Sequence, residues 1–210
     1  ITTLGATGPA GSQIAARLVE QNYDPTVFHA NGYGGAAFTR FIEEGHADGV
    51  IDMNVHELGR IRIFGAHVEM PRRFSAGARL PRVALPGALN FIGCGALDTL
   101  NEEYFSRPHY QHTNQFTHVK LTAEEMADQA THWAATLNQS IAPCHIILPM
   151  GGFSHEDRIG GAIEDANLRH ITADILEHNA QAYTVVRMPD HINSPNVSDA
   201  AVVALHNAMT

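Results

Sequence analysis

The chain has 210 residues, of which 44% are hydrophobic and 17% charged, and its formal net charge at pH 7 is −9. These values are typical of a globular protein, and no apolar run approaches the length of a transmembrane helix, so we expect no membrane partner. The negative charge argues against a nucleic acid as the main partner, because a phosphate backbone needs a basic surface.

The chain opens with two successive units of a strand, a glycine-rich turn and a helix. The first strand, Thr2–Leu4, runs into Gly5–Gly11 and then into a helix over Ser12–Gln21. The second strand, Thr26–His29, runs into a turn with three glycines and a helix over Gly35–Glu44. This order is typical of a parallel sheet, whose ligands lie at the carboxyl ends of the strands.

Further strands and helices alternate along the rest of the chain. The helix over Thr122–Asn138 begins with a capping box, because Glu125 follows Thr122 by one helical turn. Ser194 and Pro195 are a natural N-cap and first residue for the last helix. The other expected elements are strands over 49–52, 82–85, 145–148 and 183–187, and helices from about 55 and over 165–179.

Two segments, 65–81 and 91–118, show no clear period, although Pro71 could open a short helix in the first of them. The pattern as a whole predicts a single α/β domain over residues 1–210, doubly wound around a mainly parallel sheet in a Rossmann-like three-layer arrangement. Because Ile1 starts almost directly in a strand, we expect the chain to be part of a longer protein.

The reactive residue types show no metal or disulfide pattern. Cys94 and Cys144 lie far apart in the sequence, which favours two buried thiols in a cytoplasmic protein over a disulfide. The 14 histidines are scattered without metal-ligand spacing, so we expect no metal site.

The two glycine turns are the strongest functional signal. Glycines let a ligand approach the backbone, and the N–H groups at a helix start favour an anion. The spacing is neither a dinucleotide fingerprint nor a P-loop, which leaves a backbone nest for a phosphate or carboxylate; the alternative is that the glycines only permit tight turns. The ligand-binding residues predicted in the turns are Thr7, Gly8, Asn31, Gly32, Gly34 and Gly35.

A further glycine-rich segment, Met150–Gly161, follows the strand at 145–148. We interpret it as a mobile loop that closes over the site, with Ser154 and Asp157 as polar contacts and Arg158 as an anion clamp; the alternative is a solvated surface loop. Because parallel strands end at one edge of a sheet, Gly87, Ser154 and Asn193 are expected to line the same cleft as Gly32.

Histidines are the best candidates for proton transfer. His112 and His191 each lie just beyond a strand or in a loop before a helix, where a side chain can reach a ligand. Asp157 is the matching carboxylate candidate. The alternative for each histidine is a surface or a satisfied core position.

Several segments are similar to motifs of one protein family, the most specific being Val-Phe-His-Ala-Asn-Gly-Tyr-Gly-Gly. These segments are Leu4–Pro9, Val27–Gly35, Pro86–Leu89, Gly152–Gly161 and His191–Ser194. Through them nearly the whole chain resembles the second half of the tomato mosaic virus resistance protein family. The resemblance implies a further α/β domain before this one, which is missing here, and ATP as a candidate cofactor that either half could bind.

Three functions remain open. The first is an anion-binding domain for a nucleotide or for a phosphorylated or carboxylated small metabolite. The second is half of a metabolic enzyme in which His112, His191 and Asp157 transfer protons. The third is a dimeric scaffold that regulates or inhibits another protein. A domain separated from its partner domain is also expected to expose an apolar patch and to form a homo-oligomer.

Overall fold

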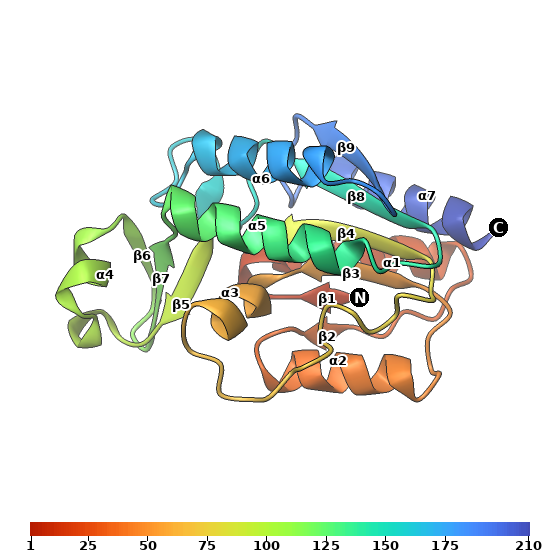
Figure 1. The fold of residues 1–210 in the computed structure, drawn as a ribbon, viewed down its shortest axis with the longest axis horizontal. Helices are drawn as coiled ribbons and strands as arrows, with labels where there is room; N and C mark the ends of the chain where they lie inside the picture. Colours follow the sequence, from red (N-terminus) through yellow and green to blue (C-terminus); the bar gives the residue numbers. More distant parts are fainter.

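The computed structural model describes all residues from 1 to 210, and a parallel β-sheet lies at its centre (Figure 1). β3 pairs with β4, β4 with β8 and β8 with β9, and β1 pairs with β2, all in parallel. The strands of the sheet are β1 Thr2–Thr3, β2 Phe28–His29, β3 Val50–Asn54, β4 Arg82–Gly87, β8 Cys144–Pro149 and β9 Thr184–Met188.

A side chain joins the β1–β2 pair to the rest of the sheet. The hydroxyl of Thr2 donates to Asp52 Oδ1 at 2.7 Å and accepts from the backbone N–H of Asn54 at 3.0 Å. β1 therefore lies beside β3, and the strands follow the order β2-β1-β3-β4-β8-β9. In this order β2 lies on one side of β1, whereas β3 and all later strands of the sheet lie on the other side. The strand order therefore reverses between β1 and β3, which is the topological switch point.

Helices cover both faces of the sheet. α1 and α7 pack together on one face, whereas α3, α5 and α6 lie on the other, and α2 follows the edge at β2. The helices are α1 Gly8–Glu20, α2 Tyr33–Glu43, α3 His56–Arg62, α4 Glu102–Ser106, α5 Ala123–Leu137, α6 Ala166–His178 and α7 Pro195–Met209. Short 3₁₀ turns lie at Gly5–Thr7, Leu97–Thr99 and His155–Asp157.

The central strands are apolar on both faces, which explains their short hydrophobic runs. In β8, Ile147 packs in the core under α1 and α7, while Ile146 and Leu148 pack in the core under α5 and α6. Side chains alternate between the two faces of a strand, so a strand with two covered faces needs apolar residues at every position. This confirms the predicted three-layer, Rossmann-like α/β fold.

The segment 91–118, which the sequence left unassigned, contains most of a second, antiparallel sheet. Its strands are β5 Phe91–Cys94, β6 His109–Thr113 and β7 Phe116–Lys120, in the order β5-β7-β6. With α4 it forms a projection at one end of the molecule (green, left in Figure 1). We call these three strands the side sheet.

Two local expectations were wrong. α1 begins at Gly8 rather than Ser12, because Pro9 is tolerated in the first turn of a helix and so does not delay its start. Pro71 opens no helix, and residues 71–79 form turns around the buried side chain of Arg73. The capping box at Thr122 and the N-cap at Ser194 are confirmed. None of the helices is both long and apolar enough to cross a lipid bilayer.

Candidate functional site

A hollow of about 240 Å³ lies at the carboxyl ends of β1, β2 and β3. The first glycine turn contributes Leu4–Ala6, and the second contributes His29 and Asn31. His56 and Arg60 come from α3, which follows β3 directly. The hollow therefore lies at the switch point between β1 and β3, where ligands of open parallel sheets bind.

The side sheet forms the opposite wall of the hollow. β5 contributes Gly93, and β7 contributes Phe116 and His118. His112 and Thr113 come from the end of β6. The segment without a sequence period thus supplies about half of the lining, including His112, which the sequence analysis selected.

Four aromatic rings form a continuous stack beside the hollow. The ring centroids are 4.9 Å apart between His56 and Phe91, 4.0 Å between Phe91 and His118, and 4.8 Å between His118 and His112. The last two pairs are nearly parallel, with interplanar angles of 17° and 15°. All three histidines of this stack line the hollow.

Burial keeps two of these histidines neutral. Burial, with smaller effects from His112 and His56, lowers the pKa of His118 to about 3. Burial and the nearby Arg60 lower the pKa of His56 to about 4. His56 Nδ1 lies 3.3 Å from the carbonyl oxygen of Ala88, to which it donates, which leaves Nε2 as an acceptor.

Arg60 is buried at the edge of the hollow without an acidic partner. Its Nε donates to His56 Nε2 at 3.4 Å, and its Nη1 donates to the carbonyl oxygen of Gly65 at 2.7 Å and lies 3.3 Å from His67 Nδ1. No carboxylate oxygen lies within 4.0 Å of its guanidinium, and Nη2 makes no hydrogen bond within the chain. Burial lowers the pKa of Arg60 from its ordinary value.

The hollow contains no acidic side chain, although the chain carries a net charge of −9. Its polar lining consists of Arg60, histidines, Asn31 and Thr113. No group of three or more His, Cys, Asp or Glu side chains is arranged to hold a metal ion. The parallel rings of His112 and His118 explain this locally, because stacked imidazoles direct their nitrogen lone pairs side by side rather than at one point.

In the second glycine turn, a carboxylate of the protein occupies the helix start. The backbone N–H of Gly32 donates to Glu57 Oε1, and a Cβ on Gly35 would overlap the Glu57 carboxylate. A Cβ on Gly34 would overlap the carbonyl oxygen of His29. Of the residues predicted in this turn only Asn31 lines the hollow, and ligand binding by Gly32, Gly34 and Gly35 remains a prediction.

The predicted residues of the first turn lie beside the hollow rather than in its lining. The Thr7 hydroxyl accepts from the backbone N–H of Leu4 at 3.1 Å, and Gly8 has open space around its Cα. Asn193 caps α1, because its side chain accepts from the N–H of Ala10 at 3.3 Å and donates to the carbonyl oxygen of Ala6 at 3.2 Å. Asn193 therefore holds the turn whose outer residues line the hollow.

Gly87 and Ser154, which were expected to share a cleft with Gly32, do not line the hollow. Gly87 lies within β4, where a Cβ would overlap the carbonyl oxygen of Met53. Ser154 is buried, and its carbonyl oxygen accepts from His191 Nε2 at 2.8 Å. Burial lowers the pKa of His191, whose Nδ1 accepts from the N–H of Asn193. None of these residues lines the hollow.

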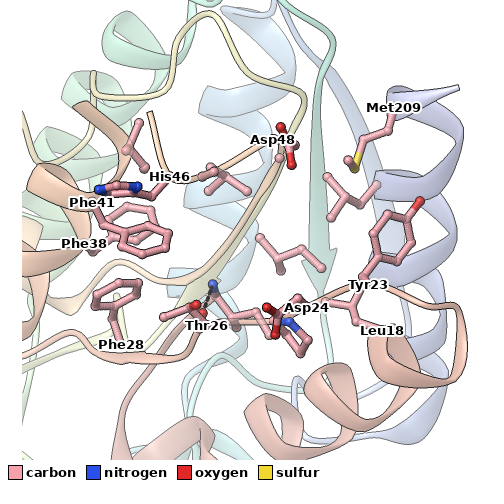
Figure 2. A pocket seen from close by; sticks show the side chains of 18 residues that line it. Leu18, Tyr23, Asp24, Thr26, Phe28, Phe38, Phe41, His46, Asp48 and Met209 are labelled. Carbon is pink, nitrogen blue, oxygen red and sulfur yellow. Dashed lines mark hydrogen bonds between the residues drawn. The ribbon is translucent and has the colours of Figure 1, made fainter. Parts of the chain in front are cut away.

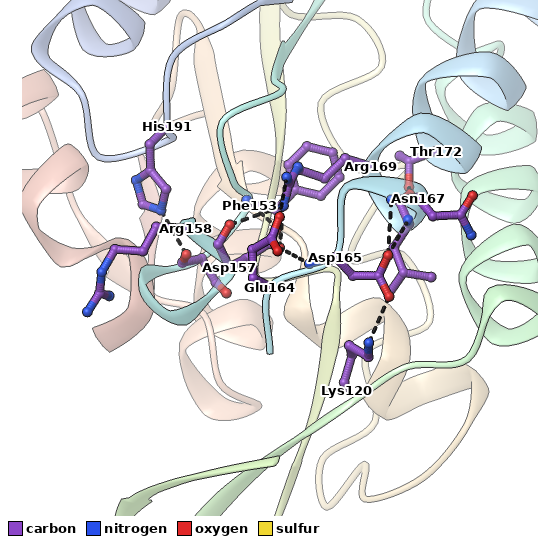
Figure 3. A network of polar contacts seen from close by, with 12 residues as sticks. Lys120, Phe153, Asp157, Arg158, Glu164, Asp165, Asn167, Arg169, Thr172 and His191 are labelled. Atoms are coloured by element: carbon purple, nitrogen blue, oxygen red, sulfur yellow. Dashed lines mark hydrogen bonds and ion pairs between the residues drawn. The ribbon is translucent and has the colours of Figure 1, made fainter. Parts of the chain in front are cut away.

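Asp157 is the centre of a buried network (Figure 3). Its carboxylate accepts from the N–H of Phe153 at 2.8 Å, from the N–H of Asp165 at 3.0 Å and from Arg169 Nη1 at 2.6 Å. Burial raises the pKa of Asp157 to about 6, against the effect of these donors. The contacts fasten the 150–161 loop to the start of α6, and Lys120 extends the network to β7 by an ion pair of 2.7 Å with Asp165.

A second hollow of about 300 Å³ lies at the opposite rim of the sheet (Figure 2). It is mainly apolar, and Figure 2 shows the rings of Phe28, Phe38 and Phe41 gathered at one side and Met209 at the other. No residue predicted to bind a ligand or to transfer protons lines it. Asp24 and Asp48 are among its lining residues and no Lys or Arg is, which disfavours an anion there.

Sequence reasoning missed His56, Arg60 and His118. A signal existed for the first two: His56 follows a buried strand directly, and Arg60 follows it by one helical turn, so both side chains share a helix face. His118 carried no such signal, because it lies in the segment without a clear period.

Comparison with known proteins found a matching family and several relatives. Residues 1–209 match the family described as "Uncharacterised protein family (UPF0261) C-terminal domain". The chain is 33% identical over 209 residues to a UPF0261 protein of Rhizobium meliloti, covering 97% of this chain and 52% of that protein. It is 30% identical over 208 residues to the ToMV susceptible protein tm-1(GCR26) of Solanum lycopersicum, covering 96% and 28%. The chain thus spans about half the length of the bacterial relative.

Proposed function

This chain belongs to the UPF0261 family, as its C-terminal domain, and we propose that it binds a small anionic molecule in the hollow between the first glycine turn and the side sheet. The class of ligand includes carboxylated and phosphorylated metabolites and nucleotides such as ATP. The proposal keeps the anion of the sequence analysis but moves its main contact from the helix starts to Arg60.

The buried guanidinium of Arg60 is the observation that carries the proposal. A buried charge is costly unless it is paired, because it loses its hydration without gaining an opposite charge. Arg60 has no carboxylate within 4.0 Å, and its Nη2 makes no hydrogen bond within the chain. An anionic ligand in the hollow would supply the missing partner.

The surroundings of Arg60 support the same ligand class. The lining has no acidic residue to repel an anion, and its position at the β1/β3 switch point is the place where open parallel sheets bind ligands. The ring nitrogens of His29, His112 and His118 make no hydrogen bonds within the chain and supply further polar contacts.

Titration of the purified chain with acetate, inorganic phosphate and ATP, followed by calorimetry at constant ionic strength, tests this function. We expect at least one probe to bind, and Arg60→Gln to weaken it by about tenfold or more, since a hydrogen bond to a charged group contributes about 1.5–3 kcal/mol. Arg62→Gln is the matched control, because Arg62 lies on the same helix but pairs with Asp128 at the surface.

A folding check accompanies this test, because Arg60 also holds Gly65 and His67. His112→Ala is the second variant: His112 is exposed, makes no hydrogen bond within the chain and lines the hollow. Thermal unfolding should leave His112→Ala close to the parent while its anion affinity falls. Equal affinity of the parent and both variants for every probe would contradict the proposed function.

A proton-transfer role is a second candidate, favoured by the position of His112 alone. Its ring lies in the hollow, free of hydrogen bonds, within reach of a bound molecule. The other two candidates of that hypothesis, His191 and Asp157, lie in hydrogen-bond networks outside the lining. An enzyme based on all three residues and a dimeric scaffold both remain hypotheses.

A further inference from the structure

We infer that the ligand of this hollow is a small carboxylate that carries a hydroxyl or carbonyl group, rather than a phosphoryl compound or a nucleotide. This inference rests on the proposed function and narrows its ligand class. It follows from the free atoms of Arg60, the charge of the lining, the unpaired ring nitrogens and the size of the hollow.

The hydrogen bonds of Arg60 leave it one free nitrogen. Nε donates to His56, and Nη1 donates to the carbonyl oxygen of Gly65, so only Nη2 is available to a ligand. A phosphoryl group spreads a charge of about −1.5 to −2 over three oxygens, and Arg recognises it best through two nitrogens at once. A single N–H-bearing nitrogen suits one oxygen of a carboxylate.

The lining carries one permanent positive charge, that of Arg60, which balances one negative charge on a ligand. Arg60 is the only Lys or Arg of the hollow, and buried His56 and His118 are neutral near pH 7, since their pKa values lie at about 4 and 3. A phosphate monoester carries about −1.5 to −2 at this pH and would remain undercompensated in a chain whose net charge is −9. A monocarboxylate would be balanced.

Neutral imidazoles provide the second half of the recognition. Each offers one N–H donor and one acceptor nitrogen, which pair with a hydroxyl or a carbonyl group but do not require a charge. Gly5 keeps the free ring nitrogen of His112 accessible, because a Cβ at that position would stand 3.4 Å from His112 Nε2.

The size of the hollow sets the upper limit of the ligand. Its volume of about 240 Å³ is below the roughly 300–1,000 Å³ that is usual for pockets of drug-sized ligands. A compound of a few carbon atoms with one carboxylate fits this space, whereas a nucleotide needs several times as many contacts.

Competition between small probes tests the inference on the purified full chain at pH 7.5 and constant ionic strength. The probes are lactate and pyruvate against acetate, inorganic phosphate and ATP. We expect lactate or pyruvate to bind at least tenfold tighter than phosphate or ATP. Acetate should bind more weakly than lactate and pyruvate, because it lacks their hydroxyl or carbonyl group. Arg60→Gln should weaken the binding by about tenfold or more, and Arg62→Gln should not.

His118→Phe separates the two halves of the recognition. Phenylalanine keeps a ring between Phe91 and His112 but has no nitrogen, so the preference for lactate over acetate should fall at least severalfold. Tighter, Arg60-dependent binding of phosphate or ATP would overturn this inference and leave the proposed function intact. Absence of Arg60-dependent binding for every probe would overturn both.

Discussion

The carboxylate of Glu57 accepts a hydrogen bond from the backbone N–H of Gly32, with the oxygen and nitrogen 2.5 Å apart. The other oxygen of Glu57 accepts from Arg73 Nε at 2.6 Å, and Arg73 also binds Asp52 through both of its terminal nitrogens. The anion that a glycine turn at a helix start attracts is therefore supplied by the protein itself. This carboxylate fixes the second turn against α3, which carries His56 and Arg60.

Replacement of Glu57 by Gln should destabilise the fold strongly. The side chains of Glu57 and Arg73 are both fully buried, and both oxygens of Glu57 accept from N–H donors, so Glu57→Gln removes a buried ion pair and turns an amide NH₂ against one of those donors. Removing one partner of a buried pair typically costs about 3–5 kcal/mol in the free energy of unfolding. Urea denaturation at pH 7 measures this loss.

The matched control is Glu44→Gln, which removes an exposed ion pair with Arg40 at the C-terminal end of α2. Solvent screens such a pair, so we expect no measurable change in stability. A Glu57→Gln variant as stable as this control would show that the internal carboxylate does not hold the second turn.

Gly34 is needed for packing. Alanine at this position would place its Cβ over the carbonyl oxygen of His29, and overpacking of this kind typically costs about 1–3 kcal/mol. Gly8→Ala is the control, because Gly8 is helical and nothing lies within 4 Å of a Cβ there. We expect Gly8→Ala to be neutral or to stabilise the chain by up to about 1 kcal/mol. Equal melting temperatures of the two variants would contradict this assignment.

The fold could be predicted where one local pattern determined one element. The strand 145–148 has apolar residues at three successive positions, Ile146–Leu148, because both faces of the sheet are covered, and helix starts such as Thr122 carry their own caps. The side sheet escaped prediction for the opposite reason. β6 is largely exposed along His109–Thr113, and β5 is a short buried strand that contains a glycine, so neither shows an alternating pattern.

The hollow lies at the edge of the sheet that the two glycine turns indicated, and His112, which the sequence suggested, is one of its lining residues. Whether this hollow is the functional site stays a prediction. The partners of the glycines could not be read from the sequence, because Glu57 and Asn193 reach the turns from distant parts of the chain. Tertiary packing decides whether the N–H groups at the start of α2 bind Glu57 or a ligand.

Asp157 is expected to act on stability. Asp157→Asn removes one acceptor oxygen and the charge that faces Arg169, while both side chains are at least 95% buried. We expect a loss of about 3 kcal/mol or more in the free energy of unfolding, measured by urea denaturation. The control is Asp174→Asn, since Asp174 pairs with Arg187 at the surface.

The same variant tests the catalytic hypothesis for Asp157. If Asp157 transferred protons to a bound molecule, Asp157→Asn would leave stability near that of the control and would change only the chemistry of the ligand. A large loss of stability with unchanged anion affinity in the folded fraction would instead establish the network of Figure 3 as structural.

The stability of the chain should fall as the pH falls from about 6.5 towards 4, and His118 should cause part of this fall. The pKa of His118 is about 3 in the folded chain and 6.5 in the unfolded one, so between these values the unfolded chain binds the additional proton. Above pH 6.5 the His118 imidazole is neutral in both states and does not change the free energy of unfolding. As the pH falls below 6.5, His118 lowers the free energy of unfolding progressively. The slope of the unfolding free energy is up to about 1.4 kcal/mol per pH unit for one such group.

His118→Phe isolates this contribution, because phenylalanine preserves the stack between Phe91 and His112 but cannot bind a proton. Burial lowers the pKa of His56 to about 4 in the same way, so the parent and the variant should both lose stability in acid. The free energies of unfolding of both proteins are measured by urea denaturation at half-unit steps from pH 4 to 7.5. As the pH falls, the variant should become more stable relative to the parent. A difference that stays constant over this range would mean that His118 is protonated equally in both states and reaches solvent in the folded chain, which would remove the neutral imidazole from the hollow.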